Sequence, residues 1–214
     1  MTAVKRLPLW KKGTLLIKKQ FKPALQTAAK KKFVFIHINK TGGTSITRVV
    51  GQPYRRHLTA KEVIDDIGME KWRKAYKFTV VRNPWDKYFS MYKWRKKTNI
   101  RGIADEDISF SDWVKRTLEE KDPDYYDYFL QRMFQPQVDW LKDYSGHIDM
   151  DKIIRFENLQ HDFKKVADTI GAPAELPHYH KTQQVSYREF YDAEAREIVA
   201  EWFKEDIKRF DYQF

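Results

Sequence analysis

Three short segments of the chain are almost continuously apolar and rich in β-branched and aromatic residues. They cover residues 33–38, 77–82 and 152–156. Runs of this length without alternating polar positions predict strands that are covered on both faces. Longer segments with a helical spacing of apolar residues separate them. The alternation predicts one α/β domain, over residues 33–214, with a central parallel sheet between two layers of helices.

Signals at the ends of the expected helices define their limits. Thr59 and Glu62 have the spacing of a capping box, and Gly68 follows as a stop signal. Pro84 suits the first turn of another helix, and Pro136 divides a later one. The expected helices cover residues 45–50, 59–67, 84–96, 111–120, 126–144, 159–170 and 192–210.

The net charge of +11 is concentrated at the start of the chain. Residues 1–32 contain ten lysines and arginines and no acidic residue, which leaves a net charge of +1 for residues 33–214. We therefore expect a basic arm over residues 1–32 and a domain that does not bind nucleic acid. The composition of the arm allows two interpretations: it packs on the domain, or it docks on an acidic membrane or polymer surface.

Cysteine usage and hydropathy narrow the class of protein. The chain contains no cysteine, which excludes disulfides and thiolate metal sites. No apolar run approaches the roughly 20 residues that span a bilayer. A signal peptide has an uninterrupted apolar segment, whereas pairs of lysines interrupt the apolar residues near the start of this chain. We expect a soluble cytoplasmic protein.

The loop after the first expected strand carries the strongest chemical signal. Residues 39–45 read NKTGGTS and lead into a helix. Glycines let the backbone approach a phosphate closely, free N–H groups at a helix start point toward it, and Lys40 adds a mobile positive charge. The kinase-type loop, G-x-x-x-x-G-K-[ST], has its lysine after the glycines, whereas Lys40 precedes them. This order favours a metal-free site for a phosphosulfate.

Two segments resemble a known family. Residues 38–45 are similar to the 5′-phosphosulfate loop of PAPS-dependent sulfotransferases, in particular the carbohydrate branch that contains heparan sulfate 2-O-sulfotransferase. Residues 80–92, VVRNPWDKYFSMY, resemble the 3′-phosphate element of that family, in which a strand-end arginine and a helical serine bind the donor. Residues 135–141, 155–159 and 206–214 look like later landmarks of the same branch.

The resemblance implies a three-layer P-loop-like fold and the transfer of a sulfuryl group from PAPS to an acceptor hydroxyl, on a carbohydrate or glycoconjugate. Lys40 would neutralise charge on the leaving phosphate. Arg82 leaves its strand at the carboxyl edge of the sheet, where open α/β folds bind ligands, and Ser90 follows two turns into the next helix. The implied donor-binding residues are Lys40, Thr41, Gly42, Gly43, Thr44, Ser45, Arg82 and Ser90.

The acceptor hydroxyl requires a base that works near neutral pH, which histidine does best. His57 directly precedes the capped helix, in the loop between the two strands that are expected to bind the nucleotide. The catalytic histidine of the heparan sulfate 2-O-sulfotransferase branch occupies a similar place, so the resemblance implies that His57 is the base. His37, inside the first strand, is expected to be a core residue, and His161 a surface residue.

Three other segments carry expectations of their own. Arg155 and Glu157 are expected to form a structural ion pair. The aromatic residues between 125 and 129 either stack on a sugar or belong to a core. Residues 178–184 align with a loop that closes over the donor in relatives, but His180 stands where asparagine is common there, and Gln183 and Gln184 stand where basic residues are common.

Two other functions remain as alternatives. A P-loop-type nucleotide kinase or NTPase would bind ATP in the presence of Mg²⁺, and the position of Lys40 argues against it. A nucleic-acid or membrane-surface binding protein would depend on residues 1–32 for its main activity.

Overall fold

In the computed structural model, the described parts of the chain are residues 33–51, 57–126, 131–177 and 186–214. The expected basic arm and the expected donor-covering loop lie outside them. Three parallel strands form a sheet in the order β1-β2-β3, which places β2 at the centre. The strands are β1 (Phe33–Ile36), β2 (Tyr76–Val81) and β3 (Lys152–Arg155). Phe35 is paired with Phe78, and Phe78 with Lys152.

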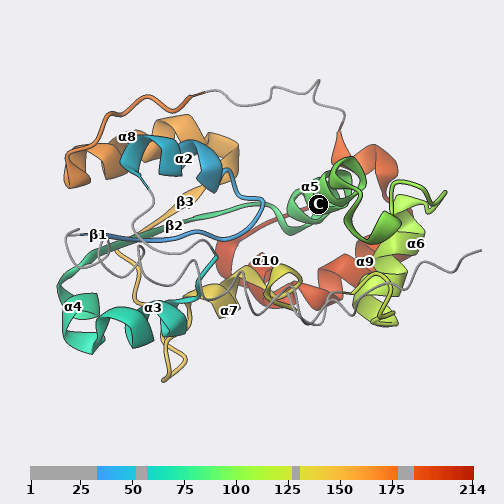
Figure 1. The fold of residues 1–214 in the computed structure, drawn as a ribbon, viewed down its shortest axis with the longest axis horizontal. Helices are drawn as coiled ribbons and strands as arrows, with labels where there is room; N and C mark the ends of the chain where they lie inside the picture. The colour runs from blue at the N-terminus through green and yellow to red at the C-terminus, as the bar shows by residue number, and fades with distance from the viewer. Residues whose placement is uncertain (1–32, 52–56, 127–130, 178–185) are drawn as a thin grey trace, which may run out of the picture.

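Helices cover both faces of this sheet, as expected. Figure 1 shows α2 and α8 on one face, and α3, α4, α7 and α10 on the other. A third group, α5, α6 and α9, lies beyond the carboxyl ends of the strands. The helices are α2 (Gly43–Val50), α3 (Ala60–Ile67), α4 (Met69–Lys74), α5 (Pro84–Thr98), α6 (Phe110–Val114), α7 (Gln137–Leu141), α8 (Leu159–Ile170), α9 (Ala193–Trp202) and α10 (Lys204–Phe210).

The alternation of side chains along the strands divides the core. Val34 and Ile36 pack with α3, α4 and α7, while Phe35 packs with α2 and α8 on the opposite face. A third apolar cluster, which contains Trp113 and Phe134, joins α5, α6 and α9. Apolar burial on both faces explains why these strands read as continuous apolar runs in the sequence.

Several expected helices are shorter than their sequence patterns. Among the described residues of the expected helix over 126–144, the structure has a 3₁₀ turn at Gln131–Met133 and the short α7, because proline lacks the N–H that would continue a helix. The expected helix over residues 192–210 breaks at Phe203 into α9 and α10. Phe203 packs into the α5–α6–α9 cluster, whereas Phe210 packs against the sheet on the face that α3, α4 and α7 cover. One straight helix cannot direct side chains at both clusters.

The residues that were expected to start two of the helices do so in the structure. Thr59 accepts a hydrogen bond from the Glu62 N–H while the Glu62 carboxylate accepts one from the Thr59 N–H, which is the expected capping box. Pro84 is the first residue of α5, and the Asn83 side chain caps that helix.

Across the residues that the structure describes, no helix combines the length and the apolar content that a membrane crossing requires.

A candidate anion-binding site at the carboxyl edge of the sheet

The residues that follow the three strands meet at one edge of the sheet. Arg82, directly after β2, donates from Nη1 to the carbonyl oxygen of Lys40 in the loop after β1, across 2.9 Å. The same guanidinium lies over the ring of Phe156, which follows β3, with its Cζ 4.0 Å from the ring centroid. The structure thus brings the two expected phosphate-binding segments into direct contact.

The two loop glycines are required by their surroundings. Gly42 has a φ of 81°, and a β-carbon there would lie 2.9 Å from Leu159 Cδ2. At Gly43 a β-carbon would lie 2.1 Å from Cδ2 of His37. As the N-cap residue of α2, Gly42 has no side chain to accept from the first turn. The start of α2 therefore has no side-chain cap, which is the usual arrangement of an anion site at a helix N-terminus.

The hydroxyl residues of the loop have different surroundings. Thr41 is fully buried, and its hydroxyl donates to the carbonyl oxygen of Ile38 across 2.9 Å. Its hydroxyl therefore stabilises the turn. Thr44 is exposed and Ser45 is half-buried at the start of α2. Their hydroxyls are the ones that can add to the backbone donors.

Lys40 is a partly desolvated cation. Burial lowers the pKa of its ammonium group to about 8, and the nearby positive charges of Arg82 and Lys93 act in the same direction. Its Nζ lies 5.4 Å from the ring centroid of Trp94. A cation held close to other cations and away from water favours a bound anion, which would restore the charge balance.

One face of α5 is directed at the loop. Asp86 accepts a hydrogen bond from Nε of Arg82 at 2.8 Å, and Trp94 lies beside Lys40. Ser90 is one helical turn from each of these residues and therefore shares their face. The structure thus places Ser90 on the side of α5 that carries the Arg82 and Lys40 contacts.

His57 is linked to the loop through His37. Its Nδ1 lies 3.0 Å from the carbonyl oxygen of His37, and the two rings are 4.6 Å apart. A carbonyl oxygen only accepts, so Nδ1 carries the proton and Nε2 holds a lone pair in the neutral ring. The His37 ring is buried and in turn contacts Gly43, which confirms the expected core position of His37.

Sequence reasoning gave no role to Arg132, which holds His57 in place. Its Nη1 donates to the His57 carbonyl oxygen at 2.8 Å, and its Nη2 pairs with Glu62 at 2.9 Å. The capping-box glutamate therefore also fixes the arginine that fixes His57, which has a positive φ of 61°. Seventy-five residues separate Arg132 from His57, and no local pattern links them.

The expected ion pair between Arg155 and Glu157 is wrong. Arg155 donates to the carbonyl oxygen of Phe210 and lies over the ring of Tyr212. Glu157 instead accepts from the Asn83 N–H at 2.7 Å and from the Tyr212 hydroxyl at 3.2 Å. Arg155 thus anchors the C-terminal segment to the edge of the sheet. Glu157 anchors both the start of α5 and Tyr212 to the same edge.

The aromatic side chains near residue 125 belong to a core. Tyr125 and Tyr126 are buried in the α5–α6–α9 cluster, so these two residues do not present a sugar-stacking surface. Residues 128 and 129 lie outside the described parts. His161, on α8, is exposed as expected.

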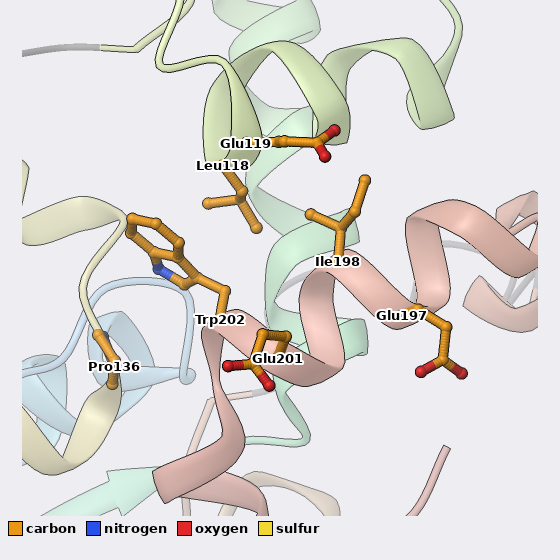
Figure 2. Close-up of a pocket in the computed structure, with 7 residues that line it drawn as sticks. All are labelled: Leu118, Glu119, Pro136, Glu197, Ile198, Glu201 and Trp202. Atoms are coloured by element: carbon orange, nitrogen blue, oxygen red, sulfur yellow. The ribbon is translucent and has the colours of Figure 1, made fainter.

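A pocket of about 590 Å³ lies elsewhere on the molecule, between the π-helix at Lys115–Glu119 and helix α9 (Figure 2). Apolar side chains and three glutamates line it. The lining residues are Leu118, Glu119, Pro136, Glu197, Ile198, Glu201 and Trp202. Three carboxylates in the lining do not suit an anionic donor, so this pocket is not the candidate site. Within the described ranges, no group of three or more His, Asp or Glu side chains is arranged to hold a metal ion.

Comparisons with known proteins identify the family and the fold of the chain. The model of the Sulfotransferase family matches residues 23–213 of the chain. A crystal structure of a sulfotransferase from Alicyclobacillus acidocaldarius is similar, with 16% identity and a TM-score of 0.50, and the match covers 85% of this chain and 94% of that chain. This likeness confirms the expected P-loop-like α/β fold. None of the curated proteins compared with the chain matches it. Because the family model spans nearly the whole domain, the chain belongs to the Sulfotransferase family.

Proposed function

We propose that this protein transfers a sulfuryl group from PAPS to an acceptor hydroxyl at the edge of the sheet where Lys40 and Arg82 meet. Membership of the Sulfotransferase family supports sulfuryl transfer in general. The observation that carries the donor assignment is the 2.9 Å hydrogen bond from Arg82 Nη1 to the Lys40 carbonyl oxygen. It links the candidate 5′-phosphosulfate loop to the candidate 3′-phosphate arginine, as a donor with phosphates at both ends of its ribose requires.

The residues present fit such a donor. Gly43 lets the ring of His37 pack against the loop, in the space that a β-carbon would need, and so supports the conformation of the loop. The first N–H groups of α2, with Thr44 and Ser45, would hold the 5′-phosphate. Arg82 and Ser90 would hold the 3′-phosphate, and PAPS supplies the sulfuryl group when it is bound.

Lys40 and His57 divide the chemistry in this proposal. Lys40 neutralises the charge that develops on the leaving phosphate. This role suits a cation that is partly buried beside other positive charges, because such surroundings favour a bound anion. His57 takes the proton of the acceptor hydroxyl at Nε2, because its Nδ1 proton is bound to the His37 carbonyl oxygen. The carbonyl thus sets the tautomer that a base needs.

We also propose that the acceptor is a carbohydrate or glycoconjugate. The support is the resemblance of residues 38–45 and 80–92 to the heparan sulfate 2-O-sulfotransferase branch. A panel of glycan, phenolic and lipid hydroxyls, assayed with PAPS, tests this choice. Sulfation of the phenol or lipid alone contradicts it.

The donor assignment is tested by calorimetric titration with adenosine 3′,5′-bisphosphate (PAP) in the presence of a chelator. We expect the intact protein to bind PAP, and the Lys40→Ala/Arg82→Ala double variant to lose that binding. If the intact protein binds only ATP, and only with Mg²⁺, the nucleotide kinase alternative replaces the proposal.

A further inference from the structure

The main chain of Arg82 is held by the side chain of a residue distant in the sequence. The Arg82 N–H donates to Oε1 of Gln137 at 2.9 Å, and Nε2 of Gln137 donates to the Arg82 carbonyl oxygen, also at 2.9 Å. Strand β2 ends one residue earlier, at Val81. The primary amide therefore binds both backbone groups of the first residue beyond the strand, as a neighbouring strand would.

Gln137 is itself fixed from the other side by Asp206. Nε2 of Gln137 donates to the Asp206 carboxylate at 3.2 Å, and the same carboxylate accepts from the Gln137 N–H at 2.7 Å and the Val138 N–H at 2.8 Å. All partners agree on one orientation of the amide group, since its oxygen faces a donor and its nitrogen faces two acceptors. Gln137 and Asp206 are both fully buried.

The carboxylate also replaces a missing cap. Helix α7 begins after Pro136, whose side chain cannot accept a hydrogen bond from the first turn. Asp206, from α10, supplies the acceptor for the N–H groups of Gln137 and Val138. The position of α7 and the orientation of the Gln137 amide are thus set by one buried group.

We propose that Gln137 and Asp206 are positioning residues that aim the guanidinium of Arg82 at the donor's 3′-phosphate. The inference rests on the proposed function, which gives Arg82 that ligand. The Arg82 side chain is only 14% exposed, and its Nε and Nη1 are bound to Asp86 and to the Lys40 carbonyl oxygen. These two contacts fix the far end of the side chain and the Gln137 amide fixes the backbone, so the direction of the guanidinium depends on both.

This arrangement has a consequence that a purely structural hydrogen bond would not have. The two hydrogen bonds between the Gln137 amide and the Arg82 backbone form a clamp. Loss of this Gln137 clamp displaces the Arg82 guanidinium, which binds the 3′-phosphate, whereas the loop after β1 and the start of α2 hold the 5′-phosphate. Selectivity for PAP over 5′-AMP, which lacks the 3′-phosphate, therefore reports on the clamp. Global stability reports on the buried hydrogen bonds in general.

The experiment measures the affinities of PAP and 5′-AMP by calorimetry, together with the free energy of unfolding, in four variants. Gln137→Met keeps the volume and removes the clamp, and Gln137→Asn serves as a milder change if the first variant does not fold. Thr79→Val is the matched control, because it removes a buried side-chain hydrogen bond from β2 to the Ile36 carbonyl oxygen without touching Arg82. Arg82→Ala removes the guanidinium itself.

We expect the Gln137 variants to lose about tenfold of the selectivity for PAP over 5′-AMP, the size of one displaced charged hydrogen bond. Thr79→Val should lose stability and keep the selectivity of the unaltered protein. An equal loss of both affinities, or unchanged selectivity, in the Gln137 variants overturns the positioning role while Arg82→Ala still abolishes selectivity. If Arg82→Ala itself leaves selectivity unchanged, the donor-site assignment and the inference that rests on it both fail.

Discussion

The ring of His37 occupies the space that a side chain on Gly43 would need, with Cδ2 only 2.1 Å from the position of a β-carbon. The contact joins the first strand to the start of α2. It also connects His57, which is bound to the His37 carbonyl oxygen, to the candidate phosphate loop. One small residue therefore keeps the expected base and the expected anion site next to each other.

We expect Gly43→Ala to lower the free energy of unfolding by about 1–3 kcal/mol, the usual cost of overpacking. In a His37→Ala background the same substitution should be neutral or stabilising, because the clash is gone and alanine favours the helix. Chemical denaturation of the four members of this cycle measures the change of sign. Thr44→Ala, at the exposed neighbouring position, is the stability control and should stay within about 0.5 kcal/mol. Equal losses in both backgrounds contradict the contact.

The affinity for PAP should fall as the pH rises through about 8. Burial and the charges of Arg82 and Lys93 lower the pKa of Lys40 to about 8 in the free protein, and only its protonated form attracts the anion. Titrations from about pH 7 to about pH 9.5 measure this dependence, since the phosphates of PAP stay ionised over that range. Lys40→Arg should give a flat profile because arginine remains charged. A flat profile in the unaltered protein would show that Lys40 does not bind the donor.

The same pKa shift has an opposite effect on stability. The folded-state pKa of Lys40 lies below its ordinary value of 10.5, so the unfolded chain binds the proton more strongly. This group's contribution to the free energy of unfolding should therefore rise with pH between about 8 and about 10.5. Lys40→Met should remove that rise and stabilise the protein at neutral pH while it abolishes PAP binding. Denaturation of both proteins at two pH values tests this, and a less stable Lys40→Met protein at neutral pH refutes it.

His57→Ala should bind PAP as the unaltered protein does and lose about 10²- to 10⁴-fold in the rate of transfer, the range for a general base. The reason is that, in the proposed mechanism, Nε2 of His57 takes the proton of the acceptor, whereas the loop and Arg82 hold the donor. A single-turnover assay with saturating PAPS measures the rate. His161→Ala, an exposed histidine on α8, is the control. Full activity of the His57 variant would remove the base from the mechanism.

Asp206→Ala should destabilise the protein by about 3–5 kcal/mol, because it leaves the Gln137 and Val138 N–H groups without their acceptor and the buried Lys87 without an opposing charge. The neighbouring Glu205→Ala removes only an exposed ion pair with Lys142 and should cost less than about 1 kcal/mol. Urea unfolding compares the two. Similar small losses in both would mean that Asp206 does not organise α7.

Local sequence patterns predicted the parts of the fold that depend on neighbouring residues. The strands, the capping box of Thr59 with Glu62, and Pro84 at the start of α5 all follow from a few consecutive positions. The break at Phe203 does not, because it depends on which of two apolar clusters each half of the segment faces.

The site divides in the same way. The loop and Arg82 carry motifs, and the rule that parallel strands end at one edge predicts that they meet. The clamp of Gln137 on Arg82 spans 55 residues, and the bond from Arg132 to the His57 carbonyl oxygen spans 75. Such contacts are set by tertiary packing, so a single sequence contains no local signal for them.

The most direct test of the central claim is a mass-spectrometric assay of PAPS incubated with a glycan acceptor and the protein. We predict one sulfate gained by the acceptor for each PAP released, with the product lost in Lys40→Ala and in His57→Ala. PAPS that stays intact with every hydroxyl acceptor of the panel, together with Mg²⁺-dependent turnover of ATP, would contradict the account.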